Sequence, residues 1–101
     1  MQYFRHKADL RIPYETQGLI YFLCQNYRIL PESEQKKIRD ICDKVSKNNG
    51  WYFNAIYEAM TTTNGILRIA LRHYVSEGVV RRLKLRFYKE YAKDIEIRLK
   101  S

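Results

Sequence analysis

Several features are scarce in this 101-residue chain, and each scarcity excludes a class of protein. The two cysteines, Cys24 and Cys42, lie apart in helically spaced apolar stretches, so we expect buried, reduced thiols and no disulfide framework. With only His6 and His73 beside them, they match no familiar metal-ligand spacing, so we expect no metal and no other cofactor. The longest apolar run, residues 18–24, is far too short to cross a bilayer.

Targeting and catalytic signals are also missing. The amino-terminal MQYFRHKADL has no apolar core of a signal peptide, so we expect a cytoplasmic protein. No nucleophile–base pair or phosphate-cradling glycine loop is visible, and Asp40 and Asp43 lie on the polar face of an amphipathic stretch. We therefore expect neither enzymatic activity nor a small-molecule substrate, although an active site assembled from distant residues leaves no local pattern.

Composition and charge describe what is present. Apolar residues make up 46% of the chain and aromatic residues 14%, which indicates one globular domain over residues 1–101. The net charge is +8, and it is uneven: residues 64–101 contain ten Lys and Arg against four Asp and Glu. Such a concentration of positive charge is typical of a surface that binds nucleic acid.

Hydrophobic spacing predicts an all-α fold, a compact bundle of four to five helices. The first, about residues 14–27, is apolar nearly all round, so we expect it to be the central helix. A second begins at Pro31 and ends at the residues Asn48, Asn49 and Gly50, which accept left-handed backbone angles. Two further helices are expected over 51–60, with Trp51 or Tyr52 inward, and over 66–73.

The carboxyl-terminal segment leaves a choice between helix and strand. Apolar residues continue from Val80 to Leu99 at steps of three or four, which predicts one long helix to about residue 98. Residues 95–99 also alternate with period two, so they could instead pair with residues 8–12 in a small two-stranded ribbon. The longer helical pattern favours the helix.

Residues 69–86, IALRHYVSEGVVRRLKLR, carry the most function-specific pattern. The small side chain of Ala70 lets a second helix cross the first closely, and Val75 fills the space between them. Ser76 suits the N-cap of the second helix because its hydroxyl accepts a hydrogen bond from a free amide. Val80 and Leu83 share one face and hold that helix against the first. The pattern predicts a helix-turn-helix with a long carboxyl-terminal recognition helix.

The outward side of this second helix concentrates positive charge. Five basic residues fall within nine positions, and the only acid between Ser76 and Lys89 is Glu77, which the helix dipole favours. Uncompensated charge of this kind favours an anionic partner, whereas two ordinary amphipathic helices joined by a tight turn would explain the apolar spacing alone. The five are Arg81, Arg82, Lys84, Arg86 and Lys89.

The segment 69–83 resembles the helix-turn-helix of bacterial and phage transcription regulators, whose corresponding string is I/V-A-x-x-x-G-V-S-x-x-T-V-x-R. The matching residues are Ile69, Ala70, Val75, Ser76, Val80 and Arg82. Tyr74 replaces the turn glycine and would need a left-handed backbone, and Val79 replaces a threonine. The resemblance covers 15 to 20 residues, and the whole chain is loosely similar to small phage-encoded DNA-binding proteins such as late-gene regulators and terminase small subunits.

This resemblance implies a sequence-selective protein that binds double-stranded DNA and regulates transcription by occupancy. The residues placed near base edges are Glu77, Gly78, Arg81 and Arg82. Those placed on phosphates are Ser76, Lys84, Arg86 and Lys89. Arg68 and Arg72, on the preceding helix, would straddle the DNA backbone.

One recognition helix contacts few bases, so such domains usually act as dimers. The stripe that could form a homodimer contact, or equally the domain's own core, is Phe87, Tyr88, Tyr91 and Ile95.

Two other functions fit the same residues. The protein could be a protein–protein interaction module, including one for a host factor or a polymerase, since its nine tyrosines are typical of interfaces. It could also be a DNA-binding accessory of a terminase or a recombination system. No membrane partner is expected.

Overall fold

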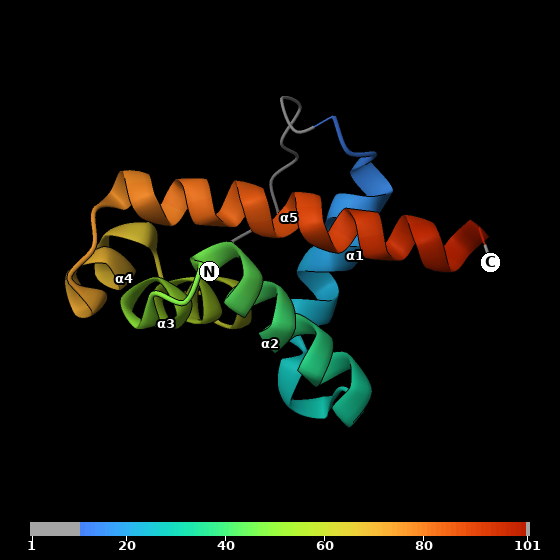
Figure 1. Ribbon diagram of the computed structural model, residues 1–101, viewed down its shortest axis with the longest axis horizontal. Helices are drawn as coiled ribbons and strands as arrows, with labels where there is room; N and C mark the ends of the chain where they lie inside the picture. Colours follow the sequence, from blue (N-terminus) through green and yellow to red (C-terminus); the bar gives the residue numbers. More distant parts are fainter. Residues whose placement is uncertain (1–10, 101) are drawn as a thin grey trace.

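The computed structural model describes residues 11–100, with side chains through residue 98. These residues form five α-helices, one short 3-10 helix and the loops that connect them. The elements are α1 (Tyr14–Gln25), η2 (Tyr27–Ile29), α2 (Glu32–Ser46), α3 (Gly50–Thr61), α4 (Ile66–His73) and α5 (Glu77–Lys100). This confirms the predicted all-α class (Figure 1). Residues 95–99 belong to α5 and not to a ribbon, and most of the expected partner strand, residues 8–10, lies outside the described residues.

Local chemistry sets several helix ends. Pro31 precedes α2, whose first turn carries the acidic Glu32 and Glu34. Lys47 and Asn48 adopt positive φ values of 52° and 66°, which terminate α2. The Asn49 side chain then accepts hydrogen bonds from two amides in the first turn of α3, at 3.0 and 3.2 Å. These boundaries match the expected ones to within about two residues because they depend on neighbours in the chain.

The long helix α5 forms the spine of the molecule and contacts α1, α2, α3 and α4 (Figure 1). Its inward face is fully buried, and it packs against apolar residues of α1, α2 and α3. The four side chains considered for a dimer contact all lie in this core. The sequence allowed either role for them, a dimer contact or the domain's own core. They are Phe87, Tyr88, Tyr91 and Ile95. A homodimer would therefore have to use other residues.

The prediction that the first helix is central was wrong. α1 buries only Gln17, Ile20 and Cys24, whereas Leu19 is exposed and Phe22 is 61% exposed. The reason is competition for the core: α5 is twice as long and packs against every other α-helix, so α1 lies at the edge and offers one face. Of the two residues expected to point inward at the start of α3, Tyr52 is the one that packs against the core, whereas Trp51 is exposed.

Both cysteines are buried free thiols, as expected. Burial raises the pKa of Cys42 to about 12 and raises the pKa of Cys24 as well, with the neighbouring Cys42 adding to the shift of Cys24. Thiolates, which are the reactive form, are therefore scarce at neutral pH.

Candidate nucleic-acid interface

The turn between α4 and α5 has the local structure that its sequence predicts. Tyr74 has φ 56° and ψ 40°, the left-handed conformation that a glycine usually supplies. The Val75 amide donates to the Ala70 carbonyl at 3.1 Å, and the Ser76 hydroxyl accepts from the Val79 amide at 3.1 Å. Ser76 is thus the N-cap of α5, and three residues, 74–76, connect the two helices.

A small apolar cluster holds α4 against α5. Ala55 of α3, Ile69 and Ala70 of α4, and Val80 of α5 are all buried together, and Val75 packs against them from the turn. Ala70 and Val80 occupy the positions at which the sequence predicted close helix contact. A larger side chain at Ala70 would push the two helices apart because protein interiors leave little free volume.

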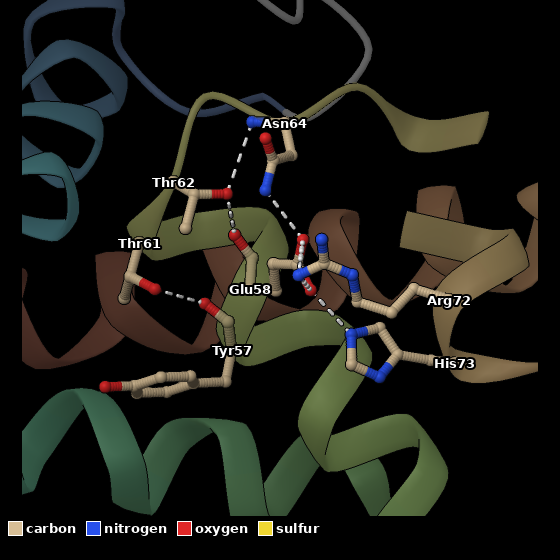
Figure 2. A network of polar contacts seen from close by, with 7 residues as sticks. All are labelled: Tyr57, Glu58, Thr61, Thr62, Asn64, Arg72 and His73. Carbon is tan, nitrogen blue, oxygen red and sulfur yellow. Dashed lines mark hydrogen bonds and ion pairs between the residues drawn. The ribbon is translucent and has the colours of Figure 1, made fainter. Parts of the chain in front are cut away.

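A buried carboxylate fixes α4 to α3. Glu58 of α3 accepts hydrogen bonds from Asn64 in the connecting loop and contacts His73 at the end of α4, both at 2.7 Å (Figure 2). Arg72 also reaches this carboxylate, at 3.3 Å. The network joins α3, the loop and α4, so it positions the helix that precedes the turn.

The charge of Glu58 is retained despite its burial. Burial by itself raises the pKa of this carboxyl, but hydrogen bonds from His73 and Asn64 and the charge of Arg72 outweigh it, so the pKa lies below its ordinary value of 4.5. Glu58 is therefore ionised at neutral pH, and its partners satisfy it.

A stripe of four cations runs along the outward face of α5. Arg82, Arg86, Lys89 and Lys93 follow one another at steps of four, three and four residues, so they share one side of the helix and span roughly 16 Å of its length. All four are exposed. Within the described residues, Arg82, Arg86 and Lys89 form no ion pair, whereas Lys93 contacts Glu90 at 3.3 Å. We call these four residues the α5 basic stripe.

The stripe borders a pocket of about 460 Å³ between α5 and the end of α2. Lys44 and Lys47 of the α2 end face Arg86, Lys89 and Lys93 across it. Its other lining residues are Ile12, Val45, Ala92, Glu90 and Glu96. Glu90 is engaged by Lys44 at 2.8 Å as well as by Lys93, so the pocket keeps a positive balance with five cations and two carboxylates. We call it the basic pocket.

The DNA-contact residues expected from the sequence fall into two groups. The first group is exposed, and its four cations form no ion pair within the described part of the chain; it contains Arg68, Ser76, Gly78, Arg82, Arg86 and Lys89. Arg72 is tied to Glu58, and Arg81 pairs with Glu77 at 3.3 Å on the surface of α5. Lys84 is half-buried and engaged in a further interaction. On α5, the charge without ion-pair partners therefore begins at Arg82, beyond the first turn, and Arg68 on α4 adds to it.

Sequence reasoning missed Lys44, Lys47 and Lys93. Lys93 continued the spacing of Arg82, Arg86 and Lys89, and a helical projection extended past residue 89 would have included it. Lys44 and Lys47 gave no such signal, because only the packing of α2 on α5 brings them to the same surface. The Glu58–His73 contact was missed for the same reason, since fifteen residues separate the two.

Comparison with known proteins adds no relative. No protein-family model matches the chain, no curated protein matches it, and neither does any solved structure. In the part of the chain that the structure describes, none of the helices has the length and apolar character needed to cross a membrane. Nor do any three metal-ligating side chains within residues 11–98 form a group that could hold an ion.

Proposed function

We propose that the protein binds double-stranded DNA through the α5 basic stripe, with α4, the Tyr74 turn and α5 acting as a helix-turn-helix. The observation that carries this proposal is the presence of three exposed cations, Arg82, Arg86 and Lys89, on one helix face without ion-pair partners in the described residues. Duplex DNA presents about one negative charge per 1.7 Å of its axis, so a stripe of this length matches many phosphates.

The basic pocket extends the same surface. Lys44 and Lys47 lie on a different helix from the stripe, so they widen the positive surface across the direction of α5. In this arrangement α5 lies in or along the major groove, which is wide enough for a helix, and the α2 end contacts the neighbouring phosphate backbone. Phosphate contacts of this kind fix orientation, and base contacts supply sequence preference.

The first two turns of α5 would supply the base contacts. Gly78 in the first turn and Arg82 in the second are exposed, and Arg81 is held only by the surface pair with Glu77. Exposed pairs contribute about 0–1 kcal/mol, so Arg81 can exchange Glu77 for a base or a phosphate at little cost. The proposed role is regulation of transcription by occupancy of a DNA site.

The test compares two double variants that each remove two positive charges. Arg86→Gln with Lys89→Gln alters the stripe, and Arg28→Gln with Lys36→Gln alters exposed cations on η2 and in the first half of α2. Binding to a fluorescent duplex is followed by anisotropy over a range of salt concentrations. We expect the stripe variant to lower the salt dependence by roughly 2 units of log K per log salt, since each lost phosphate contact removes about 0.9.

The control variant should keep both the affinity and the salt dependence of the original protein. Equal losses in the two variants would mean that net charge alone attracts DNA. No binding at physiological salt by the unaltered protein would overturn the proposal.

A further inference from the structure

A second surface of the molecule is apolar, in contrast to the α5 basic stripe. Leu67, Leu71 and Tyr74 follow at steps of four and three residues along α4 and its end, and they are 57, 70 and 81% exposed. Trp51 of α3 is 57% exposed and meets the Tyr74 ring edge to face, with ring centroids 5.4 Å apart. We call these four residues the α4 apolar patch.

The backbone at Tyr74 argues that this patch has a role beyond folding. A non-glycine residue with φ 56° is uncommon, and a bulky side chain there carries a conformational cost that glycine would avoid. The ring does not recover that cost through burial, because most of it is in contact with solvent. Contiguous exposed apolar side chains of this size typically mark a surface for a partner.

The charge beside the patch selects the kind of partner. α4 carries Arg68, Arg72 and His73 and has no Asp or Glu. Arg68 is exposed, lies three residues from Leu71 on the helix surface and forms no ion pair within the described residues. Arg72 is exposed as well, but it contacts Glu58. A second copy of this chain, with its net charge of +8, would bring like charges together. DNA phosphates would suit the arginines but leave the leucines and Trp51 without apolar contacts.

We propose that the α4 apolar patch binds an acidic amphipathic helix of another protein. The apolar side of such a helix would cover Leu67, Leu71 and the Trp51–Tyr74 pair. Its carboxylates would reach Arg68, which has no ion-pair partner within the described residues. Apolar residues spaced at i, i+3, i+4 and i+7 are the usual anchors of this recognition mode. Trp, Tyr and Arg, all present here, are the residues that most often dominate binding energy at interfaces. This proposal does not depend on DNA binding.

The test is a selection from a displayed library of amphipathic helices with constant apolar positions and randomised flanking positions. Selection on the unaltered protein is compared with selection on Leu71→Ser, and Leu19→Ser on the exposed face of α1 is the matched control. We expect Asp and Glu to be enriched several-fold at the flanking positions, with the unaltered protein and with Leu19→Ser but not with Leu71→Ser.

A selected peptide is then titrated into the protein while Trp51 fluorescence is recorded, since Trp51 is the only tryptophan in the chain. Binding should shift its emission to shorter wavelength, and replacing the acids of the peptide with Lys should weaken binding at least tenfold. Tyr74→Gly should also weaken binding at least tenfold while raising the melting temperature, which a purely structural role of the tyrosine would not allow. Arg86→Gln with Lys89→Gln should leave peptide binding unchanged.

Other results would overturn the proposal. Equal enrichment on Leu71→Ser would show that the peptides do not bind the patch. Enrichment without acidic residues would show that the patch has no preference for an acidic partner. A dimer in solution that Leu71→Ser converts to a monomer would identify a second copy as the occupant. A Trp51 response to duplex DNA that Leu71→Ser abolishes would assign the patch to DNA.

Discussion

Gly78 shows, at the scale of one residue, how a structural and a functional explanation can be separated. It lies in the first turn of α5 with a negative φ, and a Cβ there would meet only the Ser76 hydroxyl, at 3.8 Å. Nothing in the fold therefore requires glycine at this position, although glycine weakens a helix. On the proposed interface, the missing side chain leaves room for a base edge to approach the helix.

Gly78→Ala should therefore have opposite effects on stability and on binding. We expect the free energy of unfolding to rise by about 0.5–1 kcal/mol, because alanine loses less backbone entropy in a helix. DNA affinity should fall, because the added methyl group stands where the duplex approaches. Urea unfolding and anisotropy on the same preparation measure the two effects, and unchanged or tighter DNA binding would exclude close approach at this turn.

Glu58 links a single ionisation to the position of α4. Its pKa is lower in the folded protein than its ordinary value of 4.5, so the folded state favours the ionised form. The stabilisation is complete above pH 4.5 and is lost as the pH falls below that value through the folded-state pKa.

Glu58→Gln should destabilise the protein at neutral pH and have a smaller effect in acid. Removing hydrogen bonds to a buried charge costs about 1–3 kcal/mol, which is the loss expected at pH 7. Below pH 4.5 the two proteins should converge, because the carboxyl of the original protein is then progressively protonated. Urea unfolding over this pH range is the measurement, and a difference that stays constant with pH would mean that ionisation of Glu58 contributes nothing.

Ser76 acts at the scale of an element, because it caps the helix that carries the basic stripe. Ser76→Ala should lower the free energy of unfolding by about 1 kcal/mol through loss of the cap. Ser76→Asp keeps a cap and favours the helix dipole, so its stability should match that of the original protein. The aspartate nevertheless adds a negative charge beside the proposed DNA contacts and should weaken DNA binding.

Comparison of these two variants distinguishes helix formation from DNA contact. Thermal unfolding reports the cap, and anisotropy with duplex DNA reports the contact. If Ser76→Asp bound DNA as tightly as the original protein, the first turn of α5 would lie outside the interface.

The whole molecule depends on α5 as its core helix, and this bears on oligomeric state. Phe87 is fully buried inside one chain, so Phe87→Ala should lower the free energy of unfolding by about 3–5 kcal/mol. Because this residue has no exposed surface, a partly destabilised but folded variant should keep the solution mass of the original protein. Sedimentation under folding conditions measures the mass. A change of mass would mean that the apolar residues of α5 around Phe87 form a dimer contact.

The proposed sequence preference is tested on the whole protein. Selection of the protein against a random duplex pool should yield a motif, and Arg82→Ala should broaden it at one position, since a bidentate arginine–guanine contact contributes about 1–3 kcal/mol of discrimination. Two half-sites roughly one helical turn apart would indicate a dimer on DNA. Retention of DNA without any motif would indicate a non-specific binder.

The sequence by itself determined the elements whose causes are local. The helix ends at Asn49 and Ser76, the left-handed Tyr74 and the continuation of α5 past residue 95 depend on hydrogen bonds and side-chain spacing within a few residues. The apolar contacts of Ala70 and Val80 also followed from that spacing, because helix periodicity places them on one face.

Only the tertiary structure decided which apolar face becomes core and which charges share a surface. α1 and α5 both have enough apolar residues to be central, and the longer α5 takes that position because it can contact all the other α-helices at once. The same packing brings Lys44 and Lys47 next to the α5 stripe and pairs Glu58 with His73. Such contacts join residues far apart in the chain, and no local spacing encodes them.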